Sequence, residues 1–151
     1  MQRLGAAHCA ELIMYRLDFC PVAELEQQEK WDELAGVLMD AIKRLERAGA
    51  DFVIIASNTL HKVADQLEEF ISIPLLHIAD TLAEEIGKIR ISTVGLLGTR
   101  FVMEQDFYRD KLAAHGLKVL TPSSQARNSV HAIIYDELCL GKSWVHRKNG
   151  F

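Results

Sequence analysis

Two short polar runs hold the side chains of this sequence that are best suited to bind a small anion. Ser57-Asn58-Thr59 directly follows the apolar run 51–56, and Gly98-Thr99-Arg100 follows the apolar run 91–97. Hydroxyl and amide oxygens are typical helix caps, and the unpaired N–H groups at a helix start attract anions. Each run alone is explained by helix capping, whereas two such runs together favour a small carboxylated ligand. The guanidinium of Arg100 is a further candidate partner for that carboxylate.

The sequence contains no motif that indicates a nucleotide-binding site or a metal site. It contains no GxGxxG or GxxxxGK[ST] loop, and its three cysteines form no C-x-x-C pair. His61 and His77 show no metal-ligand spacing, so we predict no metal and no cofactor. We expect His77 to be partly buried with a hydrogen-bonded ring, and His61 to lie either beside the site or on the surface. Cys139 lies between two leucines and is expected to serve packing.

The elements that must position these residues are predicted from alternating apolar runs and helical patterns. Strands are predicted at 10–18, 51–56, 74–78, 91–97 and 117–120, and helices at 22–48, 59–70, 80–88, 101–115 and 125–140. Gly49, Gly116 and Gly141 each stand where a glycine commonly ends a helix. Strands that alternate with helices indicate an α/β fold with parallel sheets. Ligands of such sheets bind beyond the carboxyl ends of the strands, which is where both polar runs lie.

Composition narrows the classes of function. The 151 residues are 49% hydrophobic and 25% charged, which is typical of a globular protein with an apolar core. The net charge of -4 gives no electrostatic reason to bind nucleic acid. No apolar run reaches the roughly 18 residues needed to span a bilayer, and the first residues lack the apolar stretch of a signal peptide. We therefore predict a cytoplasmic protein with no membrane partner.

Four motifs, in order along the chain, resemble those of the cofactor-independent aspartate/glutamate racemases. They are SNTLHKVAD at 57–65, HIAD at 77–80, GLLGTRFVMEQDFY at 95–108 and IIYDELCLG at 133–141. The resemblance covers about Arg3 to Lys142. It implies two pseudo-symmetric α/β lobes, each a parallel sheet flanked by helices, with the active site between them. In this chain the lobes are expected at residues 1–89 and 90–151.

The resemblance also implies roles for the polar residues. Members of the family invert the Cα of an amino acid without pyridoxal phosphate or metal, by means of two acid–base residues on opposite faces of that carbon. Ser57 matches the first of these two catalytic positions. Asn58 and Thr59 match residues that bind the substrate carboxylate, and Thr99 matches the threonine of the corresponding turn in the second lobe. The expected ligand is a small amino acid such as aspartate or glutamate.

Three departures from the family pattern lead us to expect a chain truncated at both ends, with both lobes incomplete. Ser57 replaces a cysteine, and a hydroxyl is a far weaker acid than a thiol, whose pKa is about 8.5. The family's second cysteine lies in a Gly-Cys-Thr-Glu motif beyond Gly141, and the tail 143–151 does not continue the pattern. The family's first strand and its Gly-Gly-Met-type loop precede the point equivalent to Arg3. Losing that strand would leave strand edges unpaired, so we expect a homo-oligomer.

Three alternatives stay open beside an acidic amino-acid racemase. The first is an inactive remnant that binds a carboxylate or a partner subunit, which the missing second cysteine favours. The second is a related isomerase or decarboxylase of the same superfamily, although the stretch 103–108 is more similar to the amino-acid racemases. The third is a flavodoxin-like binding module, which would require the motif resemblance to be accidental.

Overall fold

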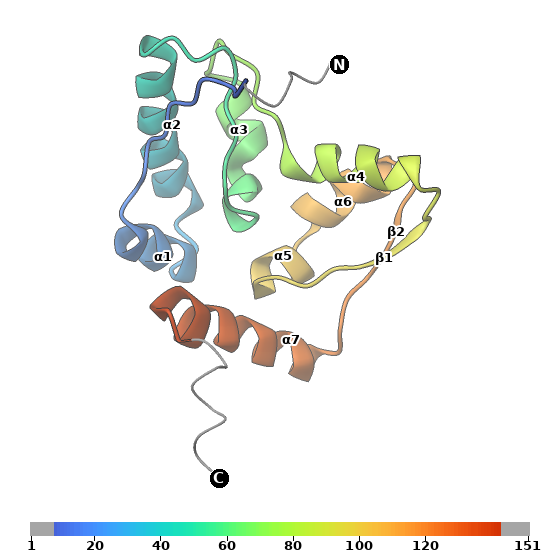
Figure 1. Ribbon diagram of the computed structural model, residues 1–151. Coiled ribbons are helices and arrows are strands. Elements are labelled where there is room, and N and C mark those ends of the chain that lie inside the picture. Colours follow the sequence, from blue (N-terminus) through green and yellow to red (C-terminus); the bar gives the residue numbers. More distant parts are fainter. Residues whose placement is uncertain (1–7, 143–151) are drawn as a thin grey trace. The chain divides into compact units, whose positions relative to one another are not determined.

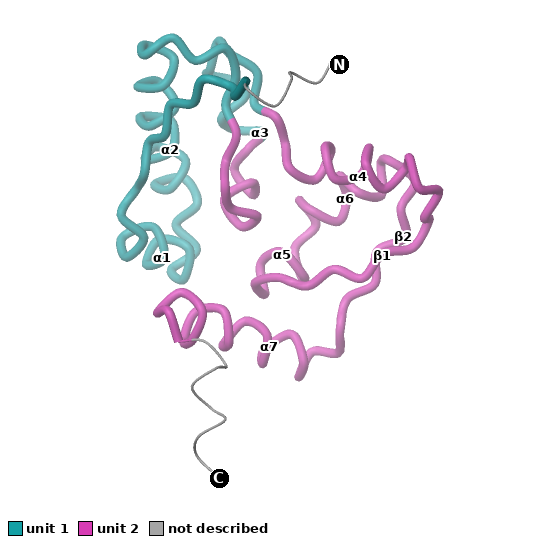
Figure 2. Tube along the Cα trace, viewed as in Figure 1, with its two compact units in different colours: residues 1–53, 65–75 teal, residues 54–64, 76–151 magenta. Residues whose placement is uncertain are grey.

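The computed structural model describes residues 8–142 and divides into two units (Figure 2). The first unit comprises the chain up to Val53 together with Asp65–Leu75. The second comprises Ile54–Ala64 and the chain from Leu76 onward, and it contains both polar runs. The expected lobes 1–89 and 90–151 are a different division, which concerns the complete fold of the family, and they stay a prediction.

Two helices, α1 (Phe19–Gln27) and α2 (Trp31–Arg47), build much of the first unit (Figure 1). Leu34, Leu38 and Ile42 recur at helical spacing on α2 and are buried, and α1 packs against α2. The prediction of one continuous helix over 22–48 is wrong. The chain turns between the two helices, where Glu29 has a φ of 54°, and a left-handed residue does not continue a right-handed helix.

Among the described residues of the first unit, the predicted strands are not formed, apart from a single parallel bridge between Val53 and Leu75. The Val53 N–H donates to the Pro74 carbonyl at 2.9 Å. The apolar run 51–56, predicted as a strand, is not buried throughout, because Val53 is buried but Phe52 is 53% exposed. Residues 10–18, also predicted as a strand, are irregular. A strand is stable when a neighbour pairs with its backbone groups, and the described part of this unit pairs in that way at Val53 alone.

The second unit alternates helices with two short strands. Its elements are, in chain order, the 3₁₀ helix Thr59–Val63 leading into α3 (Ala64–Glu68), then α4 (Ile78–Lys88), β1 (Thr93–Gly95), α5 (Arg100–Glu104), α6 (Asp106–Ala114), β2 (Lys118–Leu120) and α7 (Ser124–Ala132). A π turn, Ile133–Glu137, and a 3₁₀ turn, Leu138–Leu140, follow α7. The second unit thus contains every residue predicted to bind or react.

β1 and β2 pair in parallel, as predicted, with Val94 opposite Val119. Helices α5 and α6 form the crossover that a parallel pair requires. Both strands are shorter than the predicted runs 91–97 and 117–120. The described chain is therefore mostly helical with a small parallel sheet, and the α/β prediction is confirmed at this coarse level.

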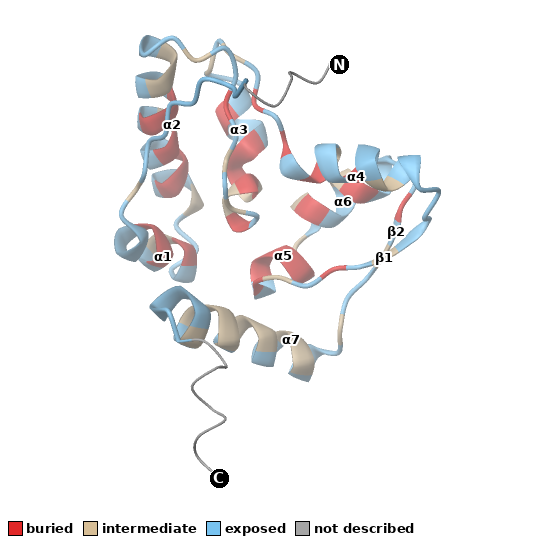
Figure 3. Cartoon of the chain, in the orientation of Figure 1, coloured by how far each residue is buried: buried red, intermediate tan, exposed pale blue. Residues whose placement is uncertain are grey.

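An apolar core holds the second unit together. Its buried members are Ala79, Ala83, Leu96, Val102, Tyr108, Leu112 and Leu117. They come from α4, α5, α6 and the ends of the strands, and α4 lies beside α6 (Figure 1). Three consecutive residues of α5, Phe101–Met103, are buried, whereas the strands are largely exposed (Figure 3). Leu120, the last residue of β2, is 51% exposed, and Leu97, two residues after β1, is 67% exposed, so apolar side chains at the ends of the strands are uncovered.

The predicted helix ends are confirmed at the glycines, because Gly49, Gly116 and Gly141 have φ values of 91°, 79° and 71°. Helix interiors were predicted less well. The predicted helix 101–115 breaks at Gln105, whose backbone is extended, and the predicted helix 125–140 stays α-helical only within α7.

Cys139 is exposed and lies in the 3₁₀ turn after α7, so the prediction that it serves packing is wrong. Leu138 and Leu140 are also exposed in that turn. Among residues 8–142, no helix has the length and apolar character needed to cross a membrane.

Candidate functional site

The first polar run forms a tight turn that leads into the 3₁₀ helix Thr59–Val63. The Ser57 Oγ accepts a hydrogen bond from the Leu60 N–H at 3.5 Å, so this hydroxyl caps the helix start. Asn58 is exposed, whereas the Thr59 side chain is buried. The turn therefore offers one amide side chain to solvent and one hydroxyl to the interior.

The second polar run caps α5. The Thr99 Oγ1 accepts a hydrogen bond from the Val102 N–H at 3.4 Å, which is the helix-capping role expected for this residue. A Cβ on Gly98 would come within 3.1 Å of the Val102 side chain, which would have to shift to make room for it. The Arg100 side chain is exposed, with its guanidinium 6.0 Å from the Phe101 ring centre.

The fold brings the two runs together within the second unit. The Thr59 and Thr99 hydroxyl oxygens lie 3.0 Å apart, in a buried hydrogen bond between residues that are 40 positions apart in the sequence. Whichever threonine donates, the hydrogen of the other hydroxyl is not used by this pair. That hydrogen is available to an acceptor such as a carboxylate oxygen.

Tyr108 is a further residue of this group, and the sequence reasoning missed it. Its hydroxyl donates to the Asn58 Oδ1 at 3.2 Å, and its ring lies in the apolar core. Burial raises the pKa of Tyr108, so the hydroxyl stays protonated and able to donate. With Oδ1 engaged in this way, the amide nitrogen of Asn58 remains as a donor. The sequence signal was present, because a tyrosine on the buried face of a helix usually needs a polar partner.

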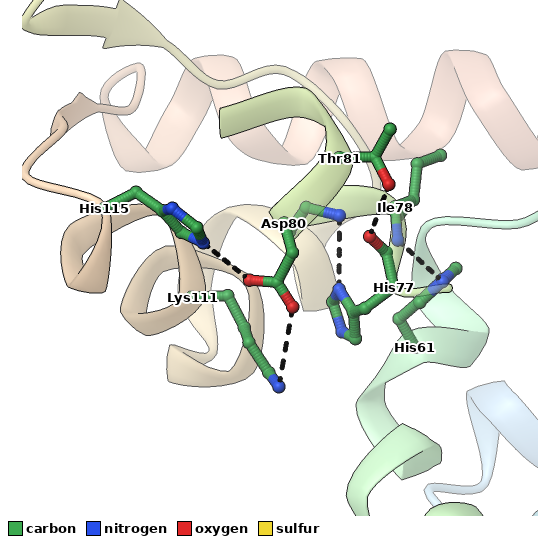
Figure 4. A network of polar contacts seen from close by, with 8 residues as sticks. His61, His77, Ile78, Asp80, Thr81, Lys111 and His115 are labelled. Carbon is green, nitrogen blue, oxygen red and sulfur yellow. Dashed lines mark hydrogen bonds and ion pairs between the residues drawn. The ribbon is translucent and has the colours of Figure 1, made fainter. Parts of the chain in front are cut away.

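Two buried histidines connect the first run to α4 (Figure 4). The His61 Nδ1 lies 2.7 Å from the Ser57 carbonyl oxygen, and its Nε2 accepts a hydrogen bond from the Ile78 N–H at 3.2 Å. His77 caps α4 through its Nδ1, which accepts from the Ala79 N–H at 3.1 Å. The expected hydrogen bond of the His77 ring is confirmed, and the residue is buried rather than partly buried, at 5% exposed. His61 is 2% exposed, which excludes the surface alternative.

The residues around Ser57 offer little for acid–base or metal chemistry. Burial lowers the pKa of His61, and the hydrogen bond to the Ser57 carbonyl opposes that effect. Both ring nitrogens of His61 are engaged by the backbone, so this ring is not placed to take a proton from the Ser57 hydroxyl. Residues 8–142 contain no group of three or more histidine, cysteine or carboxylate side chains that would hold a metal ion. The groups gathered here are hydroxyl and amide hydrogen-bond donors, whose chemistry suits an anion.

Comparison with known proteins gives a consistent result. The family model of the Asp/Glu/hydantoin racemases matches residues 1–143. The broad specificity amino-acid racemase RacX of Bacillus subtilis (strain 168) is 30% identical over 105 residues, which are 68% of this chain and 46% of that protein.

Solved structures agree with that match. A candidate Asp/Glu racemase from Yersinia pestis is 44% identical with a TM-score of 0.81, over 96% of this chain and 64% of that one. An aspartate racemase homologue from Pyrococcus horikoshii OT3 is 35% identical with a TM-score of 0.76, over 93% of this chain and 61% of that one. This chain spans less than two thirds of the length of each of these relatives. By the family match, the sequence identities and the shared fold together, it belongs to the Asp/Glu/hydantoin racemase family.

Proposed function

We propose that this chain is part of a cofactor-independent racemase of acidic amino acids, in which Asn58, Thr59 and Thr99 bind the substrate carboxylate. The observation that carries the proposal is the 3.0 Å hydrogen bond between Thr59 and Thr99, because it joins the two polar runs in one place. The similarity to the Bacillus subtilis protein, a broad specificity amino-acid racemase, supports an amino acid as the ligand.

Carboxylate binding follows from the donors available. One threonine hydroxyl hydrogen and the Asn58 amide hydrogens are the candidate contacts to the carboxylate oxygens. Hydrogen bonds to a charged acceptor contribute about 1.5–3 kcal/mol each when the donors are already in position. Tyr108 supports this arrangement because it holds the Asn58 oxygen and so orients the amide.

Racemisation needs two groups on opposite faces of the substrate Cα. One group removes the proton as the Cα–H bond breaks, and the other delivers a proton to the opposite face as a new Cα–H bond forms. Ser57 is proposed for one of these groups. The resemblance places the other in a Gly-Cys-Thr-Glu motif, which this sequence does not contain. We therefore expect this chain by itself to bind an acidic amino acid without inverting it at an enzymatic rate.

The wider architecture is part of the same proposal. In the complete racemase fold, residues 1–89 and 90–151 would belong to two lobes that enclose the substrate. Uncovered apolar side chains such as Leu97 and Leu120 favour self-association, so a homo-oligomer is proposed as well.

A second candidate function, carboxylate binding without any proton transfer at Cα, is favoured by the surroundings of Ser57. The hydrogen-bond partner of its Oγ is the Leu60 N–H, and the neighbouring His61 ring is engaged at both nitrogens. A serine hydroxyl needs an adjacent base before it can react. In the described part of the chain, no side chain is hydrogen-bonded to the Ser57 Oγ to serve as that base.

One experiment separates the two candidates. The chain is incubated with each enantiomer of aspartate and glutamate in deuterated water, and chiral chromatography with mass spectrometry follows inversion and deuterium uptake. We expect binding, measured by calorimetry, without inversion above the buffer rate. Inversion that the Ser57→Ala variant abolishes would show instead that a residue of this chain supplies the second group. Absence of binding to all four amino acids would contradict the proposed site.

A further inference from the structure

The two hydrogen bonds of the His61 ring determine where its proton lies. The Nε2 accepts from the Ile78 N–H, so this nitrogen carries no hydrogen. A neutral imidazole has one N–H, which must then be on Nδ1, where it donates to the Ser57 carbonyl at 2.7 Å. Both backbone partners are satisfied by the neutral ring in this one tautomer. A protonated ring would instead place a second N–H against the Ile78 N–H.

This bridge fixes the direction of a peptide group in the candidate site. The Ser57 carbonyl belongs to the same planar peptide as the Asn58 N–H, and the two groups of a trans peptide point in opposite directions. When the His61 Nδ1–H holds the carbonyl, the Asn58 N–H is held pointing away from the ring. The anchor at the other end is the start of α4, a helix whose Ala79 and Ala83 lie in the apolar core.

We infer that His61 is a positioning residue that holds the Ser57–Asn58 peptide in a single orientation by bridging it to the start of α4. This inference rests on the proposed function, because the turn it holds is the proposed carboxylate site. His61 itself need not touch the ligand. Its effect passes through the direction of the Asn58 N–H and through the placement of the Thr59 hydroxyl that follows.

The charged and titratable neighbours of His61 favour the neutral ring. The His77 ring lies edge-on with its centre 4.5 Å away, and its Nδ1 already accepts from the backbone of α4. Lys111 of α6 adds positive charge that disfavours a second cation. Asp80 of α4 is the nearby anion of the network, and it is engaged by His115 at 2.9 Å and by Lys111 at 3.9 Å (Figure 4). No described contact joins Asp80 to His61.

Three substitutions of His61 remove its two hydrogen bonds one at a time or both together. In His61→Asn the amide nitrogen takes the place of Nδ1 and can still donate to the Ser57 carbonyl. In His61→Gln the longer side chain can reach the Ile78 N–H with its oxygen, but the donation to Ser57 is lost. His61→Phe keeps a ring and removes both bonds. The exposed His115 in the same network provides the matched control, His115→Phe.

The expected order of affinity for aspartate follows from these contacts. His61→Phe and His61→Gln should each raise the dissociation constant about tenfold, whereas His61→Asn and His115→Phe should change it less than about threefold. Nitrogen-15 NMR of the wild-type imidazole near neutral pH should show hydrogen on Nδ1 and none on Nε2. The residual dipolar coupling of the Asn58 N–H, which reports the direction of that bond, should differ from wild type in His61→Phe and stay close to wild type in His61→Asn.

These readouts keep the inference distinct from the proposed function. If the wild type binds no acidic amino acid, the proposed function fails, and the tautomer and the Asn58 dipolar coupling decide the inference alone. A ring with its hydrogen on Nε2 or with both nitrogens protonated at neutral pH overturns the inference. So does a His61→Phe variant whose Asn58 N–H dipolar coupling matches wild type. If His61→Phe does not fold, the contrast between His61→Asn and His61→Gln still tests the claim.

Discussion

The two polar turns of the second unit are held in different ways. The Thr99 turn is a regular helix cap, in which the Thr99 hydroxyl accepts from an N–H three residues further on. The Ser57–Thr59 turn depends on distant segments, through the bonds of His61 to Ile78, Asn58 to Tyr108 and Thr59 to Thr99. The Thr99 turn thus has a local cap with two distant partners, Thr59 and His131, whereas the Ser57–Thr59 turn is tied to three distant segments. Substitutions in the supporting segments should therefore disturb the two turns unequally.

The largest expected effect comes from Tyr108, which supports the Ser57–Thr59 turn from the core. Tyr108→Ala removes a buried ring and its hydrogen bond and should lower the free energy of unfolding by about 3–5 kcal/mol. Tyr108→Phe removes the hydroxyl alone and should cost about 1 kcal/mol. It should also weaken aspartate binding, because the Asn58 amide loses its fixed orientation. Urea unfolding and calorimetry measure both effects. Equal stability of the two variants would show that the ring does not belong to the core.

A smaller effect is expected at the locally encoded turn. Thr99→Ala removes the cap of α5 and should lower the free energy of unfolding by about 1 kcal/mol, whereas Thr99→Ser keeps the hydroxyl. Thr93→Ala, at an exposed position in β1, is the matched control and should cost less. If Thr99→Ser destabilises as much as Thr99→Ala, the capping hydroxyl is not what stabilises the turn.

The smallest effect is a pH dependence that both turns share. His61 accepts the Ile78 N–H beside the first turn, and His131 accepts the Arg100 N–H at 3.1 Å beside the second. Burial lowers the pKa of His61 and, at His131, acts together with the positive charge of Arg100. The unfolded chain then binds protons at a pH where the folded chain does not. The contribution of the two neutral histidines to the free energy of unfolding should therefore be fully present above a pH of about 6.5. The free energy of unfolding should fall as the pH drops below that value.

Urea unfolding at a series of pH values between about 7.5 and 5 checks this dependence. The slope of the free energy of unfolding against pH should be reduced by His61→Phe. His131→Phe should reduce it less, because His131 is less buried than His61. A slope that neither substitution changes would assign the pH dependence to other groups.

The sequence predicted those features that are encoded within a few residues. Glycines with positive φ ended helices at the predicted places, Thr99 capped its helix, and the parallel pairing of β1 with β2 was anticipated from two apolar runs separated by a helical pattern. The family was recognised from short ordered motifs, and the family match confirmed it.

Features that depend on distant partners were predicted poorly. Residues 10–18 have the composition of a strand, but composition does not show whether a neighbouring strand is there to pair with. Neither Glu29 nor Gln105 is a glycine or proline, so nothing local indicated that helices break there. The partners of Asn58 and His61 lie far along the chain, which is why the tyrosine support and the histidine bridge emerged only from the structure.

The central claim is that the Ser57–Thr59 turn and the Thr99 turn form one carboxylate site, and a double-mutant cycle tests it most directly. Thr59→Val, Thr99→Val and the double variant keep the side-chain shape and remove the hydroxyls. The dissociation constant for aspartate is measured for all four proteins by calorimetry. We predict that the two substitutions are coupled by at least about 0.5 kcal/mol, because the hydroxyls share one hydrogen bond and one ligand. Effects that add within about 0.3 kcal/mol would contradict a shared site.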